Sequence, residues 1–149
     1  MLRRARPEDV DELAVILRTA MRGAMPSLPE LHTPDEDRLF LRDAVLPHQE
    51  VWIAEVDGRP VGFAALGSRD GHDYLQHIYV APEFQGAGLG SKLIDRAKTR
   101  RPAGFRLWVF QRNDCACRFY ERHGLRVVEL TEGSDNEERE PDALYEWVP

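Results

Sequence analysis

The chain has 149 residues, of which 42% are hydrophobic and 31% charged, a composition typical of one globular domain with its own core. Its formal net charge of −6 argues against nucleic acid, which binds basic surfaces. No apolar run approaches the length of a membrane span, and we expect no signal peptide at the N-terminus. We therefore expect a single domain over residues 1–149, with neither a nucleic-acid nor a membrane partner.

The N-terminal third of the chain predicts one short strand and two helices. Residues 2–6 form the candidate strand. A proline followed by acidic residues, then apolar residues at helical spacing, predicts a helix over residues 7–22. A proline-punctuated loop over residues 25–34 leads into a second helix, which begins near Thr33 and stops before Pro47.

The middle of the chain predicts three strands and a helix. Strands at 51–56 and 61–66 flank Asp57-Gly58, a dipeptide that favours a tight hairpin. A third strand at 74–80 runs into a glycine-rich turn. The helix that follows this turn should bury four apolar residues, namely Leu89, Leu93, Ile94 and Ala97.

The C-terminal part predicts a strand, a helix and two closing strands. Residues 105–110 are strand-like, and Asn113 is a good N-cap for a helix that ends at Gly124. Strands follow at 126–130 and 143–148. The order β-α-α-β-β-β-α-β-α-β-β predicts an α/β fold, with a mixed sheet covered by helices on both faces.

The only two cysteines, Cys115 and Cys117, lie two positions apart in a predicted helix and therefore point to different faces. This spacing favours neither a disulfide nor a zinc pair, and we expect no metal. Free thiols are typical of a reducing compartment, so we expect a cytoplasmic protein.

The glycine-rich turn predicts a phosphate site. Three glycines at every second position allow a tight turn and leave backbone N–H groups uncovered at the start of a helix. The spacing lacks the third glycine of a dinucleotide fingerprint, and Ser91-Lys92 reverses the order that a nucleotide triphosphate loop requires. A glycine-rich turn without a ligand is the alternative.

What does fit is Gln85-x-x-Gly88-x-Gly90, which resembles the acyl-CoA pyrophosphate loop of the GNAT superfamily of N-acetyltransferases. A second block is similar to the family's strand-and-helix pattern, and the similarity extends over nearly the whole chain. This block consists of Asn113, Ala116, Phe119, Tyr120, Glu121 and Gly124, and departs from the family only at Leu125, where an aromatic residue is usual. The resemblance implies a mostly antiparallel sheet with one splayed parallel strand pair.

The resemblance also implies acetyl-CoA as the acyl donor and direct attack by an amine in a ternary complex. The backbone N–H of Ile78 would hold the thioester carbonyl, Asn113 would bind the pantetheine arm, and Tyr120 would protonate the leaving sulfur. Alternatively, Asn113 is an N-cap only and Tyr120 an ordinary packed aromatic. The residues expected to bind acetyl-CoA are Ile78, Tyr79, Val80, Gln85, Gly86, Ala87, Gly88, Leu89, Gly90, Ser91, Asn113 and Tyr120.

The general base is left open by the sequence. Many relatives carry a glutamate where this chain has Gln76, and an amide cannot accept the proton. His77, or His72 at the entrance of the strand, is the candidate substitute because histidine titrates near neutrality. A lone histidine is more often a packed or surface residue, and adjacent strand residues face opposite sides, so His77 reaches the site only if the strand is splayed.

The amine acceptor should lie between the loops at 25–34 and 131–142. The second loop carries six acidic residues against one arginine. Its acids are either a solvated turn or a means of attracting a cationic amine. We expect Gln76, His32, Glu137 and Glu138 to bind a small cationic amine, a lysine or an N-terminal amine. A catalytically weak acyl-CoA sensor is the alternative function, motivated by Gln76, and a homodimer is an open alternative.

Overall fold

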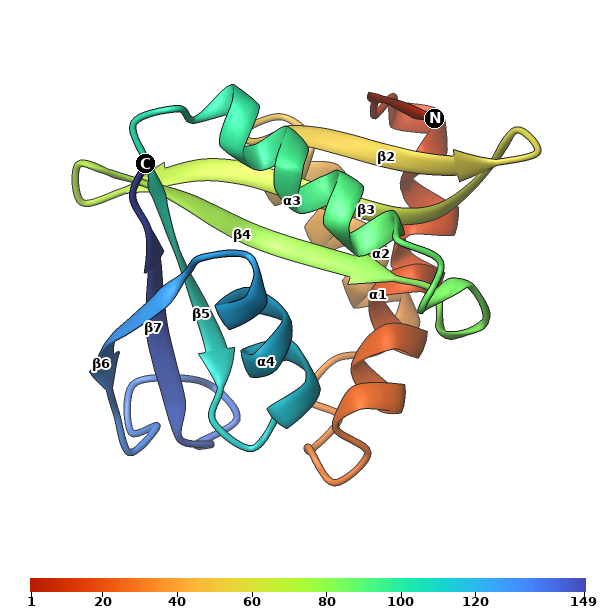
Figure 1. Cartoon of the computed structure of the whole chain (residues 1–149). Coiled ribbons are helices and arrows are strands. Elements are labelled where there is room, and N and C mark those ends of the chain that lie inside the picture. The colour runs from red at the N-terminus through yellow and green to blue at the C-terminus, as the bar shows by residue number, and fades with distance from the viewer.

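The computed structural model describes residues 1–149 and contains one seven-stranded sheet between two layers of helices (Figure 1). The strands are β1 (Leu2–Arg4), β2 (Glu50–Val56), β3 (Arg59–Arg69), β4 (His72–Val80), β5 (Phe105–Phe110), β6 (Arg126–Leu130) and β7 (Asp142–Trp147). The helices are α1 (Val10–Ala24), α2 (Pro34–Phe40), α3 (Leu89–Arg100) and α4 (Asp114–Arg122), with 3-10 turns at Pro7–Asp9 and Pro82–Phe84 and a π-helical turn at Leu41–Val45. The predicted order of elements is therefore confirmed.

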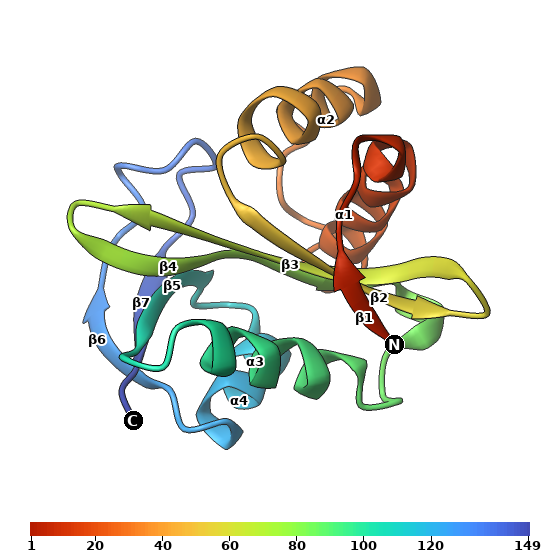
Figure 2. The ribbon, with the colours of Figure 1, turned by 90° about the horizontal axis from the view of Figure 1, so that it is seen from above.

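The sheet has the spatial order β1-β2-β3-β4-β5-β7-β6, and only β4 and β5 run parallel. Helices α1 and α2 cover one face of the sheet, and α3 and α4 cover the other (Figure 2). The expected α/β class, with helices on both faces and a mostly antiparallel sheet, is confirmed.

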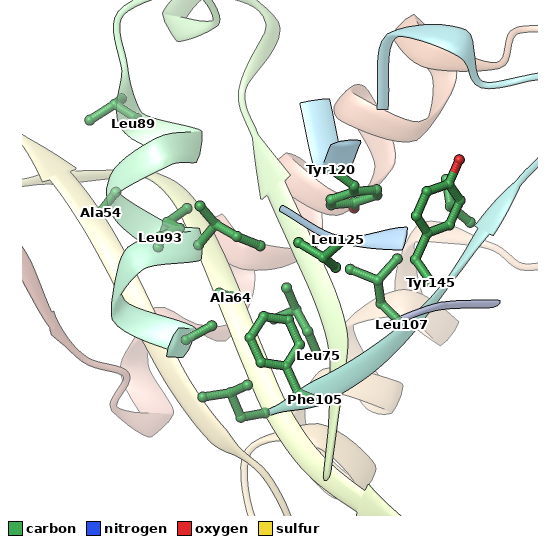
Figure 3. Packing of buried hydrophobic residues seen from close by; sticks show 14 of the residues in the cluster. Ala54, Ala64, Leu75, Leu89, Leu93, Phe105, Leu107, Tyr120, Leu125 and Tyr145 are labelled. Atoms are coloured by element: carbon green, nitrogen blue, oxygen red, sulfur yellow. The ribbon is translucent and has the colours of Figure 1, made fainter. Parts of the chain in front are cut away.

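Each face of the sheet has its own buried core. On the α3/α4 face, the four residues predicted for α3 are all buried, together with Phe105 and Leu107 of β5 (Figure 3). On the α1/α2 face, Leu13 of α1 packs with Phe63 of β3 and with Leu41. The apolar periodicity of the helices thus predicted correctly which residues cover the sheet.

Two Asp-Gly dipeptides form the tight turns that join β2 to β3 and β3 to β4. Asp57 and Gly58 have φ of 53° and 77°, as a primed hairpin turn requires, which confirms the predicted hairpin. Asp70 and Gly71 adopt nearly the same angles, 52° and 80°. The same dipeptide signal was present there, and it explains why β4 begins at His72 and not at Tyr74.

The parallel pair β4–β5 is joined at one point only. Tyr74 pairs with Arg106, and beyond this bridge the two strands separate, as Figure 1 shows. On its other side β4 stays paired with β3, but with a bulge: His77 pairs with Ala65, and Leu75 pairs with Leu66, so that Gln76 is the extra residue. The expected splay is present, and the bulge in β4 begins beside it.

A charged cluster holds the end of α3 against β2. Glu50 accepts hydrogen bonds from Arg100 Nε at 2.6 Å and from Trp52 Nε1 at 2.7 Å. Arg101 Nη1 lies 3.2 Å from the other carboxylate oxygen of Glu50. These donors outweigh the cost of burying the carboxylate and lower the pKa of Glu50 from 4.5 to about 2.

We expect Glu50→Gln to lower the free energy of unfolding by about 1–2 kcal/mol at pH 7, a modest value because Arg100 is half exposed. Since the folded state depresses the pKa, the stabilisation is present above pH 4.5 and is lost as the pH falls toward 2. Urea denaturation at several pH values measures the difference, with Glu132→Gln as an exposed control. If the difference in unfolding free energy between the wild type and Glu50→Gln stayed constant down to pH 2, this role of Glu50 would be contradicted.

Candidate functional site

The bulge in β4 determines which side chains surround the separation of β4 and β5. Ile78 and Val80 pack against the core on the α3/α4 face, whereas Tyr79 packs on the α1/α2 face. Gln76 lies over Gly67 of β3, with its Cγ 3.4 Å from the place where a Cβ of that glycine would lie. His77 packs edge-on against Phe40 of α2, with ring centroids 5.7 Å apart.

Gln76 and His77 therefore both project on the α1/α2 face, although they are neighbours in a strand. A regular strand would place them on opposite faces. The bulge removes this alternation, because it adds one residue between Leu75 and His77. The expectation that His77 depends on the splay alone is thus corrected, since the bulge also sets its direction.

The glycine-rich turn forms an open cradle before α3. Gly86 and Gly88 both have φ of 83°, and a Cβ at either position would meet nothing within 4 Å. The amide N–H groups of residues 86–91 make no hydrogen bond within the chain. Unpaired N–H groups at a helix N-terminus are suited to an anion, so the cradle fits the pyrophosphate of a CoA donor.

Gly90 has a different role from the other two glycines. It lies inside α3, and a Cβ there would come within 3.2 Å of the Phe119 ring of α4. This glycine therefore allows the two helices to pack closely. The expectation that all three glycines serve the turn is correct only for Gly86 and Gly88.

Two side chains of the loop are engaged by the protein itself. Gln85 Nε2 donates to the carbonyl oxygen of Val80 at 2.9 Å, and Ser91 Oγ lies 3.0 Å from His123 Nε2 of the segment after α4. Both contacts hold the loop against its neighbours. The contact between Ser91 and His123 joins residues far apart in the sequence, and no local pattern pointed to it.

Two of the predicted residues belong to α4: Asn113 is its N-cap, and Tyr120 lies in its last turn. Asn113 Oδ1 accepts a hydrogen bond from the Ala116 N–H at 3.2 Å, which confirms its role as N-cap and leaves its Nδ2 group free. Tyr120 is 8% exposed and lies beside Tyr145 in the core (Figure 3). Its phenol makes no hydrogen bond within the chain, and burial raises its pKa above the ordinary value.

His77 and Tyr79 have strongly shifted pKa values. Burial lowers the pKa of His77 to about 4, and its Nδ1 atom has no hydrogen-bond partner. His77 is therefore neutral at pH 7. Burial, with a smaller effect from the negative charge of Glu138, raises the pKa of Tyr79 to about 12.

The two loops that we expected to border the acceptor are tied together. His32 Nε2 lies 2.7 Å from a carboxylate oxygen of Glu137, and this contact raises the pKa of His32. Arg112, between β5 and α4, donates to Glu140 at 2.7 Å and to Ser27 Oγ at 3.2 Å. The role of Arg112 was not predicted, since it depends on contacts with two distant loops.

Glu138 is the acid of this loop that remains free near the sheet. It is half-buried, makes no hydrogen bond or ion pair, and lies close enough to Tyr79 to affect its pKa. The loop around it is held by internal hydrogen bonds, including one from Asn136 Nδ2 to the Glu140 carbonyl at 2.7 Å. Of the acids expected to attract a cation, Glu137 and Glu140 already have partners, and Glu138 does not.

Two further features bear on the class of site. No group of three or more His, Cys, Asp or Glu side chains is gathered as a metal ion would require. None of the helices combines the length and the apolar composition needed to cross a membrane.

Comparison with known proteins identifies relatives of the chain. A family model described as "Acetyltransferase (GNAT) domain" matches residues 47–127, more than half of the chain. The peptidyl-lysine N-acetyltransferase YjaB of Salmonella typhimurium is 27% identical, with 90% of this chain and 88% of that protein covered. The peptidyl-lysine N-acetyltransferase YiaC of Escherichia coli is 30% identical, with coverage of 72% and 70%.

A solved structure agrees with the fold. PaiA N-acetyltransferase from Thermoplasma acidophilum, in complex with coenzyme A, is 18% identical and superimposes with a TM-score of 0.79 over 100% of this chain and 98% of that one. At this identity the likeness concerns the fold.

We expect Gly88→Ala to weaken acetyl-CoA binding about tenfold, because a Cβ in the left-handed conformation costs about 1–2 kcal/mol and the cradle must shift to relieve it. Calorimetric titration with acetyl-CoA measures the loss. Gly71→Ala is the matched control, since Gly71 has φ of 80° and equally open surroundings but lies in a distant turn. An equal loss of affinity in both variants would show that general strain, and not the cradle, is responsible.

Proposed function

The chain belongs to the GNAT family of acetyltransferases, and we propose that it transfers an acetyl group from acetyl-CoA to the side-chain amine of a lysine in a peptide or protein. The observation that carries the donor side is the row of unpaired N–H groups over residues 86–91. Two relatives that are named peptidyl-lysine N-acetyltransferases support the choice of acceptor. A small cationic amine is the alternative acceptor.

On the donor side, we assign the N–H groups of residues 86–91 to the pyrophosphate, where the positive end of α3 adds to their attraction. The separation of β4 and β5 leaves room for the pantetheine arm beside strand edges that have no partner. Within it, we assign the N–H of Ile78 to the thioester oxygen and the free Nδ2 of Asn113 to the arm. Acetyl-CoA itself supplies the activated acyl group.

Tyr120 is our candidate for the proton donor. Burial raises its pKa, so the phenol stays protonated at neutral pH. A protonated phenol can give its proton to the leaving thiolate, which would otherwise be a poor leaving group in a site screened from water.

Glu138 is our candidate for the group that receives the amine. A lysine amine has an ordinary pKa of about 10.4 and arrives as a cation, which a free carboxylate attracts. Accepting a proton converts a carboxylate into a neutral acid, but it would convert His77 into a buried cation. Burial opposes the second change, as the lowered pKa of His77 shows, so we favour Glu138, acting directly or through water, over His77.

Replacing the phenol oxygen tests the proton donor. We expect Tyr120→Phe to lower kcat about a hundredfold with a lysine peptide, the typical effect of losing one acid–base group, while acetyl-CoA binding is retained. Release of CoA is followed by mass spectrometry, because Cys115 and Cys117 react with thiol dyes. Wild-type turnover at every pH would remove Tyr120 from the mechanism.

Parallel variants test the acceptor side. We expect Glu138→Gln to lower kcat/KM for the lysine peptide about a hundredfold, and His77→Gln to lower it much less. Glu132→Gln, an exposed acid of the same loop, is the control. The opposite order of effects would assign the base to His77.

The same assay separates an enzyme from a sensor. Turnover is measured with a panel of lysine peptides, polyamines, aminoglycosides and amino acids. Acetyl-CoA binding with no turnover of any amine would favour the sensor function, and turnover of polyamines alone would favour a small acceptor.

A further inference from the structure

The half of the sheet formed by β5, β7 and β6 carries no helix on the α1/α2 face. Figure 2 shows both helices above β1 to β4, with only the loop between β6 and β7 rising beside the other strands. Phe105, Leu107 and Val109 of β5 belong to the core on the α3/α4 face. The alternation of strand residues therefore places Arg106, Trp108 and Phe110 on this helix-free face.

Trp108 is the most exposed of the large apolar residues that β5 places on this face, and 38% of it is exposed. Its cross-strand partner is Leu144 of β7, which is 4% exposed and outside the α3/α4 core. In the neighbouring row, Arg106 and Glu146 form an ion pair at 2.8 Å and so neutralise each other. Trp108, with the buried Leu144 opposite it on β7, thus forms a small uncharged surface, which we call the Trp108 shelf.

The Trp108 shelf borders the separation of β4 and β5. Tyr74 pairs with Arg106 at the last point where the two strands meet. Trp108 follows this bridge by two residues on β5, and Gln76 follows it by two residues on β4. On the β4 side, His77 packs against Phe40, which is 44% exposed. Partly exposed aromatic residues therefore lie on the β4 side and on the β5 side of the separation, where the proposed reaction would admit the amine.

We propose that the Trp108 shelf binds the residue next to the acceptor lysine, and that the protein prefers lysines with a large apolar or aromatic neighbour. This inference rests on the proposed acetylation of peptide lysines. The shelf is continuous with the strand separation, so a chain whose lysine enters there must place a neighbouring side chain against Trp108. Polyamines and aminoglycosides have no apolar side chain to place on it.

A peptide side chain suits the shelf better than a second copy of the chain does. One exposed aromatic beside a buried leucine matches a single side chain, whereas a stable protein–protein interface buries about 1,200 Å² or more. The shelf also offers no net charge to pair with a partner. Its selectivity should therefore depend on apolar contact alone.

The test uses lysine peptides that are identical except for one residue beside the lysine, which is Phe, Leu, Ser or Asp, on either side. We expect wild-type kcat/KM to be about tenfold higher for the Phe peptide than for the Ser peptide, as burial of one large apolar side chain predicts. Trp108→Ala should lower kcat/KM for the Phe peptide to the value for the Ser peptide, and should leave kcat/KM for the Ser peptide unchanged. Trp108→Phe should restore much of the preference.

Leu130→Ala is the control, because Leu130 is 65% exposed on the opposite face of the sheet. Acetyl-CoA affinity is measured for each variant, and we expect it to stay at the wild-type level. The melting temperature is measured as well, to confirm that each variant is folded at the assay temperature; Trp108→Ala should lower it somewhat, because more than half of Trp108 is buried. A wild type without preference, or a preference that survives in Trp108→Ala, overturns the inference. The inference is also overturned if the wild type is a dimer and Trp108→Ala dissociates it, because the shelf is then an interface between two copies of the chain. If no lysine peptide is acetylated at all, the proposed function fails first.

Discussion

The separation of β4 from β5 is the constraint on which the rest of the structure depends. Parallel strands normally share a full row of hydrogen bonds, and unpaired backbone groups in a sheet are costly unless something else satisfies them. Here one bridge at Tyr74 and Arg106 holds the strands together, after which they part. The sheet remains intact because β3 pairs along the length of β4 and β7 pairs with all of β5. The open strand edges are thus supported from both outer sides.

The two sides of this opening are built with different kinds of interaction. The donor side consists of a helix N-terminus and α4, both packed into the larger core. The side that we propose for the acceptor consists of two loops joined by His32 with Glu137 and by Arg112 with Glu140 and Ser27, and of these side chains only Glu140 is largely buried. Surface ion pairs contribute little to stability, whereas a packed core resists change. The two loops can therefore change at less cost to stability than the packed core on the other side of the opening.

Much of the fold could be predicted because the signals that specify it are local. The glycine-rich turn, the Asp57-Gly58 hairpin and the buried face of α3 each depend on a few neighbouring residues. The bulge at Gln76 has no such signal, since it arises from how β4 fits between β3 and the opening. The ties of Arg112 join segments far apart in the chain, and periodicity carries no information about them. Glu138 is one acid among several in the sequence, and what distinguishes it is a half-buried position near Tyr79 without a partner, which the sequence does not reveal.

The contact of Gly90 with Phe119 has a consequence for distances within the protein. A Cβ at position 90 would lie 3.2 Å from that ring, so α3 and α4 are packed closely here, and an alanine would require the ring or the helices to shift by a few tenths of an ångström. Tyr120 follows Phe119 in α4. The distance from the glycine cradle to the Tyr120 phenol therefore depends on the absence of a side chain at Gly90. Close packing of two helices at one glycine thus helps to set the distance between two parts of the proposed donor site.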